Sequence, residues 1–180
     1  MKSLLYTLLT FSVCIVLCGC PYESFYPIDK DPQQYIDESL LGKWASFVAR
    51  PSFENEYIES PVKIIFEKRS DMEYNIAITG YIDDLRKFKV VENDTIRGVG
   101  FISVIDSRQF LNTQIRGKYY IAEIKRVNEL FSLLTLKENF TAKFVKSSTE
   151  LRNALQVHYK TKPEPSYDDW FVAKNLQKVN

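Results

Sequence analysis

The sequence predicts a mainly β protein: an antiparallel eight-stranded barrel or barrel-like sheet with a short N-terminal helix, a C-terminal helix and a short last strand. From Lys43 to Lys137, apolar side chains recur at every second position, which is typical of strands with one buried and one solvated face. Turn-forming residues interrupt this alternation at the spacing of an all-β sandwich or barrel. Near the two ends of the domain, apolar residues instead recur at the spacing of a helix face.

An export signal precedes this domain. Lys2 supplies the positive charge, residues 4–17 the apolar stretch, and Gly19 the small residue before a cleavage site. The apolar stretch is shorter than the ~20 residues of a membrane-spanning helix. Pro21, which cannot continue a helix interior, follows it closely. We therefore expect a cleaved signal rather than a transmembrane anchor.

The stretch Leu17-Cys18-Gly19-Cys20 resembles the lipobox of bacterial lipoproteins. Of the three cysteines, only Cys20 follows a small residue, and Cys18 at the second lipobox position is a tolerated departure. The resemblance implies cleavage between Gly19 and Cys20, diacylglycerol on the Cys20 thiol, and acylation of the new amine. Two or three acyl chains give stable membrane anchoring. The alternative is an ordinary secretory signal with chance cysteines.

We expect four parts: a signal peptide at 1–19, a lipidated tether at 20–30, a single β domain at 31–176 and a tail at 177–180. The mature chain of about 160 residues suffices for one core. All three cysteines lie within the first twenty residues, so no disulfide can hold the domain. Without Lys2, basic and acidic residues balance, which gives no electrostatic footprint for nucleic acid or an anionic membrane surface.

The first helix is expected to begin at Asp31 as the cap, with Pro32 in the first helical position and Gln34 where a capping box needs it. Gly42 is placed to end it. The expected strands follow, near 43–49, 61–68, 73–82, 86–91, 97–105, 109–115, 118–127 and 130–137. Gly98 and Gly100, within one strand, indicate a bulge or a close backbone approach.

The second helix is expected near 148–159, after a capping box formed by Ser147 and Glu150. Leu151 and Leu155 share one face of this helix and should pack on the outside of the barrel or across its mouth. The apolar segment Trp170–Ala173 predicts a short final strand or a plug against the sheet.

This order of elements resembles the lipocalins and the wider calycin group, with Gly42-Lys43-Trp44 in the place of their Gly-x-Trp motif. The resemblance implies a barrel that carries a small hydrophobic ligand. Two features depart from it: residues 115–119 lack the Thr-Asp-Tyr-type motif, and residues 134–145 contain no arginine to stack on the tryptophan. The chain also resembles small uncharacterised bacterial lipoproteins through Phe110-Leu111-Asn112 and a Ser-x-x-Glu-Leu helix, which brings no activity with it.

Candidate catalytic groups are few. His158 is the single histidine, and its place on the apolar side of the helix suits packing better than proton transfer. The acidic pairs Asp83-Asp84 and Asp168-Asp169 are sequence neighbours, which point to opposite faces of a strand. We therefore expect no catalytic centre, no metal site and no cofactor, and the sequence assigns no ligand-binding residues.

These observations predict an exported cell-envelope lipoprotein, bound to the membrane through acyl chains on Cys20, and in the outer membrane if the source is Gram-negative. Its expected role is that of a non-catalytic interaction or structural module, whose partner is an envelope protein. The alternative is a lipocalin-like carrier of a small hydrophobic molecule. Nucleic acid is not an expected partner.

Overall fold

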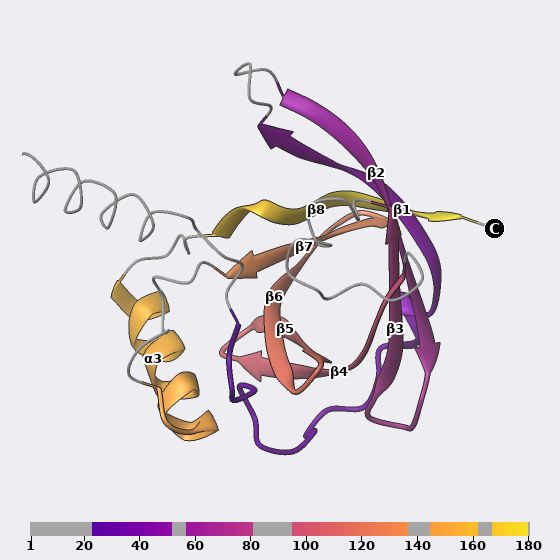
Figure 1. Cartoon of the computed structure of the whole chain (residues 1–180). Helices are drawn as coiled ribbons and strands as arrows, with labels where there is room; N and C mark the ends of the chain where they lie inside the picture. Colours follow the sequence, from indigo (N-terminus) through magenta and orange to yellow (C-terminus); the bar gives the residue numbers. More distant parts are fainter. Residues whose placement is uncertain (1–22, 52–56, 81–94, 137–144, 162–166, 180) are drawn as a thin grey trace, which may run out of the picture.

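The computed structural model describes residues 23–51, 57–80, 95–136, 145–161 and 167–179 (Figure 1). Within them, antiparallel strands close into an eight-stranded barrel in which each strand pairs with its neighbours in the chain and β8 pairs with β1. The expectation of an antiparallel eight-stranded barrel or barrel-like sheet is confirmed, and the structure shows that the barrel is closed. The strands are β1 (Gly42–Pro51), β2 (Tyr57–Lys68), β3 (Tyr74–Gly80), β4 (Thr95–Ile105), β5 (Arg108–Ile115), β6 (Lys118–Val127), β7 (Leu130–Leu136) and β8 (Tyr167–Val179).

The C-terminal segment closes the barrel. In the described residues seven strands precede the helix, and the eighth, β8, lies between β7 and β1. The expected last strand is therefore a full member of the barrel, and residues 177–179, expected as a tail, pair with β1. Without β8, both β1 and β7 would present unpaired backbone edges. The strand expected near 86–91 lies outside the described residues.

Three two-residue hairpin turns fix the register from β4 to β7. They lie at the expected breaks, and their first residues, Asp106, Arg116 and Asn128, all have positive φ. Such turns match the right-handed twist of the flanking strands. The β4–β5 and β6–β7 turns share one end of the barrel with the β2–β3 turn, which we call the Trp44 end. The β5–β6 turn lies at the opposite end, which we call the far end.

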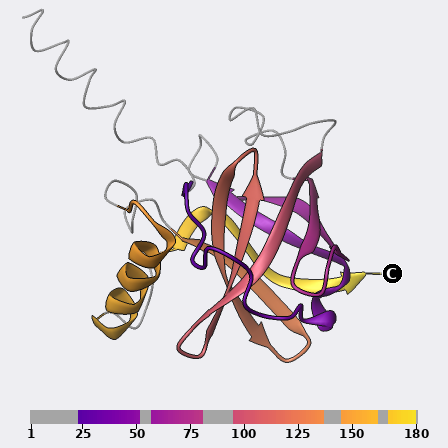
Figure 2. The ribbon, with the colours of Figure 1, turned by 90° about the horizontal axis from the view of Figure 1, so that it is seen from below.

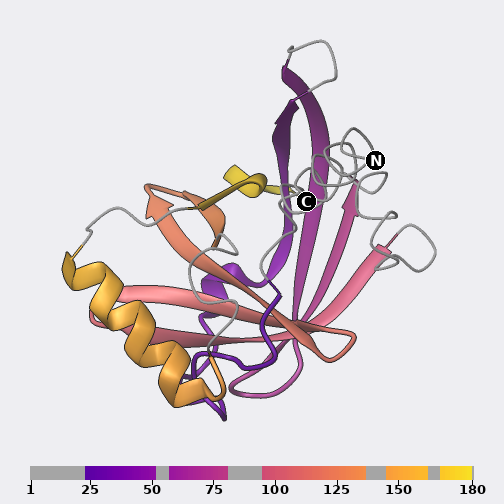
Figure 3. The ribbon, with the colours of Figure 1, turned by 60° about the vertical axis from the view of Figure 1, so that its left-hand side comes forward.

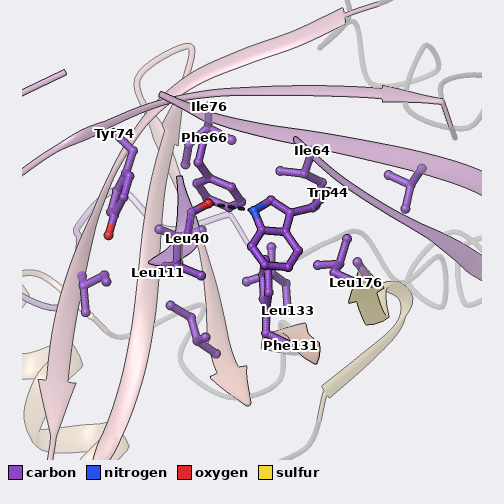
Figure 4. Close-up of a cluster of buried hydrophobic side chains, with 14 residues drawn as sticks. Leu40, Trp44, Ile64, Phe66, Tyr74, Ile76, Leu111, Phe131, Leu133 and Leu176 are labelled. Carbon is purple, nitrogen blue, oxygen red and sulfur yellow. Dashed lines mark hydrogen bonds between the residues drawn. The ribbon is translucent and has the colours of Figure 1, made fainter. Parts of the chain in front are cut away.

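An aromatic cluster fills the barrel at the Trp44 end (Figure 4). The Trp44 ring meets Phe131 edge to face with centroids 4.6 Å apart, and Phe131 meets Phe66 at 6.2 Å. The indole N–H of Trp44 donates to the Leu40 carbonyl at 2.7 Å, which satisfies its buried polar atom. Lys178 of β8 places its ammonium 5.6 Å from the Trp44 ring, so the last strand supplies a cation beside the tryptophan.

The helix expected to begin at Asp31 does not form. A single 3-10 turn, η1 (Glu38–Leu40), takes its place and is capped by Asp37. The reason is tertiary: the backbone N–H of Ile36 donates to the Asp71 carbonyl, and that of Asp37 to the Tyr74 hydroxyl. Two backbone N–H groups that would donate within a helix therefore donate to the β2–β3 region at the Trp44 end instead.

The helix α3 (Ser148–Thr161) packs on the outside of the barrel (Figures 1 and 3). A capping box forms at the predicted Ser147 with its second bond shifted by one residue: Ser147 Oγ accepts from the Glu150 N–H, whereas the Glu150 carboxylate accepts from the N–H of Lys146 rather than that of Ser147. Leu151 and Leu155 are fully buried, as predicted. They join a second apolar cluster with four residues of the barrel wall: Ile105, Phe110, Ile121 and Leu136.

The wall under α3 is therefore apolar on both faces. Leu111 points into the barrel, whereas its neighbour Phe110 points out and is equally buried. The expectation of one dry and one solvated face is wrong for this part of the sheet. Strands covered on both sides lose the simple alternation that identifies a half-buried sheet.

Replacement of Leu155 by alanine is expected to lower the free energy of unfolding by about 2–5 kcal/mol, because it opens a cavity between α3 and the wall. Val157→Ala, one half-turn away on the exposed side of α3, is the matched control and should change it by less than about 0.5 kcal/mol. Urea unfolding measures both. Equal effects of the two variants would mean that α3 does not pack as described.

Candidate functional site

Residues 23–41, here called the strap, form the feature that links the N-terminus to the barrel. The strap starts toward the far end, crosses the outer wall and then covers the Trp44 end (Figure 2). Residues 20–30 were expected to be a lipidated tether. Residues 24–29 have bends at positions 25, 26, 28 and 29 and are bonded to the wall and to α3. The following paragraphs give each attachment.

The first attachment is a two-bond bridge between Ser24 and Tyr119. The Ser24 N–H donates to the Tyr119 carbonyl at 2.8 Å, and the Tyr119 N–H donates back at 2.7 Å. Among the described residues, β7 pairs with β6 only from Ala122 onward, so there the first residues of β6 have no strand beside them on that edge. The strap bonds this edge, which would otherwise attract another chain.

The second attachment is a buried amide. Asn112 is fully buried on the outer face of β5, and its Oδ1 accepts from the Ile28 N–H at 2.8 Å. Its Nδ2 donates to Ser103 Oγ at 2.9 Å and to the Phe101 carbonyl at 3.3 Å. Asn112 thus supplies the hydrogen-bond acceptor for the Ile28 N–H, a buried backbone donor of the strap. Buried polar groups require such partners.

The third attachment joins the strap to α3. The guanidinium of Arg152 donates to both carboxylate oxygens of Asp29, from Nε to Oδ1 at 3.0 Å and from Nη2 to Oδ2 at 2.9 Å. This bidentate geometry is the strongest form of the arginine–carboxylate pair. Next to it, Ile28 is buried in the same cluster as Leu151 and Leu155. The strap is therefore held by the wall and by the helix together.

At the Trp44 end, the strap is bonded to strands β3 and β6. Arg126 Nη2 lies 2.5 Å from Asp37 Oδ2, and Arg126 Nη1 donates to Ser39 Oγ at 3.0 Å. The Tyr74 hydroxyl accepts from the Asp37 N–H at 2.6 Å. Burial raises the pKa of Tyr74 to about 12, so this hydroxyl stays protonated at any physiological pH.

The barrel interior is closely packed along β4. A Cβ atom on Gly100 would lie 2.5 Å from Ile76 Cδ1, and one on Gly98 would lie 2.7 Å from the Gln114 carbonyl oxygen. The expected close backbone approach at these glycines is confirmed. At this level the side chains of the neighbouring strands fill the space above β4, as an eight-stranded barrel allows.

A second buried polar group, Glu123, lies on the outer face of β6. Arg108 Nη1 binds its Oε1 at 3.0 Å, the Tyr167 hydroxyl donates to its Oε2 at 2.5 Å, and Arg108 lies over the Tyr159 ring. Burial, then the hydrogen bond to the carboxylate, raises the pKa of Tyr167 well above its usual value, so it remains a donor. The alternation of polar and apolar residues, with Glu123 between Ala122 and Ile124, predicts that Glu123 lies on the solvated face. This prediction is wrong, because this part of the outer face is covered and Glu123 is buried.

His158 is half-buried on α3, with its ring edge to face against Tyr159 at 5.6 Å. Asp168 and Asp169 are consecutive residues of β8. Asp83 and Asp84 lie outside the described residues. Among the residues that the structure describes, no cluster of three or more His, Cys, Asp or Glu side chains is arranged to hold a metal ion.

Gly19 and Cys20, the expected cleavage and lipidation residues, lie outside the described residues, which begin at Glu23. In the described ranges, none of the helices has the length and apolar character to cross a membrane. Sequence reasoning missed Asn112 and Glu123 as polar attachment points. For Asn112 there was a signal: an amide directly after the apolar pair Phe110-Leu111, at the position that shares a strand face with Phe110.

Comparison of the chain with protein-family models, with curated proteins and with solved structures gave no match in any of the three.

Asn112→Ala is expected to lower the free energy of unfolding by about 1–3 kcal/mol, because the Ile28 N–H is left buried without an acceptor. Hydrogen exchange at residues 24–29 should accelerate in this variant. Gln114→Ala, an exposed position on the same strand, is the control and should leave exchange of the strap unchanged. Normal protection of the strap in Asn112→Ala would contradict its role as an attachment.

Proposed function

We propose that this protein is an exported lipoprotein of the bacterial cell envelope, acylated at Cys20, that acts as a non-catalytic interaction or structural module. The lipobox-like stretch Leu17–Cys20 supports the anchor. The observation that carries the proposal is the bridge between Ser24 and Tyr119, because it joins the folded barrel to the chain only four residues after Cys20. A barrel so attached is held close to its anchor.

The packing inside the barrel favours an interaction or structural role over transport. The aromatic cluster fills the barrel interior around Trp44. Side chains of the neighbouring strands also fill the interior next to Gly98 and Gly100. The polar groups buried on the outer wall, Asn112 and Glu123, are used to bond the strap and β8. Their described contacts are those of structural attachments.

The second candidate is a carrier of a small hydrophobic molecule. A closed barrel with an apolar lining supports it, since eight strands leave room either for packed side chains or for one small ligand. The two functions differ in one measurable property, which is binding of an apolar ligand within the barrel.

Cys20→Ser is expected to move the protein from the membrane fraction to the soluble fraction, because it removes the acylated thiol. Cys18→Ser and Cys14→Ser, within the expected signal peptide, are the matched controls and should leave it in the membrane fraction. Mass spectrometry of the mature N-terminus supplies the second readout. An unmodified N-terminus at a residue other than Cys20 would rule out the proposed anchor.

The purified protein is expected not to enhance the fluorescence of N-phenyl-1-naphthylamine, an apolar probe, because its own side chains occupy the described levels of the interior. Bovine β-lactoglobulin, a ligand-binding barrel, serves as the positive control. Saturable enhancement that a fatty acid reverses would favour the carrier over the interaction module.

A further inference from the structure

We propose that the protein rests on the membrane surface through a defined patch at the far end of the barrel, formed by Phe25, Arg97, Arg116 and Lys118. The partner is a bilayer surface with anionic phospholipid headgroups. This inference rests on the proposed acylation of Cys20. It adds an orientation and a contact surface that the anchor alone does not specify.

The length of the chain before the strap limits the orientation. Three residues lie between Cys20 and Ser24, and the four Cα–Cα steps that join the two positions span at most about 14 Å when fully extended. Ser24 is fixed to Tyr119, two positions after the β5–β6 turn. The β6–β7 turn at Asn128 lies nine residues further along β6, or roughly 30 Å of strand. Acyl chains on Cys20 therefore hold the start of β6, rather than the β6–β7 turn, near the bilayer.

An exposed aromatic side chain lies at this attachment. The Phe25 side chain is 70% exposed, although both residues beside it are partly or fully buried. Lys118 Nζ lies 3.2 Å from its ring centroid, so the ring and an ammonium group form one unit. Aromatic rings next to basic groups suit the headgroup region, where the apolar part is shielded and the charge stays hydrated.

The charges around Phe25 are mostly basic. Arg116 is exposed in the β5–β6 turn, and Lys118 follows it on β6. Arg97 is exposed on β4. The next residue, Gly98, lies against the Gln114 carbonyl of β5, which places Arg97 beside the end of β5. The acidic group described in this patch is Glu23, 3.7 Å from Lys118. Among the residues that the structure describes, basic side chains therefore outnumber acidic ones in this patch, which complements anionic headgroups.

The test uses the full acylated protein with a single reporter. With Cys14 and Cys18 removed with the signal and Cys20 acylated, a Phe25→Cys variant carries one free thiol, which is labelled with an environment-sensitive nitrobenzoxadiazole dye. The protein is reconstituted into vesicles of phosphatidylethanolamine and phosphatidylglycerol. Ser107→Cys in the β4–β5 turn, exposed at the Trp44 end, is the matched control. Arg116→Cys provides a second reporter within the patch.

The dye at positions 25 and 116 is expected to show blue-shifted emission and quenching by spin-labelled lipids, whereas the dye at position 107 shows neither. Lys118→Glu should reduce the shift at position 25, and so should vesicles of phosphatidylcholine alone. Equal, water-like emission at all three positions of an acylated protein would overturn the inference and leave the proposed function standing. A mature N-terminus without acyl chains would remove the proposed function and this inference together.

Discussion

Pairing of β8 with both β1 and β7 is the constraint on which the rest of the structure depends. It removes the two edges that an open seven-stranded sheet would expose. The same strand brings Tyr167 to the buried carboxylate of Glu123, Leu176 to the core and Lys178 to the Trp44 ring. Barrel closure, core packing and the outer polar network therefore all require the last segment of the chain to be in place.

The second organising feature is the apolar outer wall, which needs a cover that the sheet cannot provide. The helix α3 and the strap share this task, and the Asp29–Arg152 pair joins one cover to the other. The strap is also the segment next to the proposed lipid anchor, so under that proposal the part of the chain nearest the membrane would be built into the fold. This distinguishes the arrangement from a domain on a flexible leash, whose orientation at a membrane is unrestricted.

Local patterns predicted what local interactions determine. The hairpin at Arg116–Gly117, the capping box at Ser147 and the burial of Leu155 follow from turn chemistry and helical spacing, and the structure contains all three. The failures concern partners distant in sequence. Asp31 looked like a helix cap, but the neighbouring donors are bonded to the β2–β3 region. Glu123 looked solvated, because nothing near it in sequence reveals that β8 and Arg108 enclose it.

The contacts of the strap also form late in folding. Ile28 bonds to a side chain 84 positions later in the chain, and Asp29 to one 123 positions later. Contacts of such separation form late, since long loops must close before they are gained. During synthesis, the strap thus emerges long before its partners exist. Under the proposed acylation, the enzyme that modifies Cys20 would meet a chain whose strap is not yet bonded, and the finished barrel would take up the strap only afterwards.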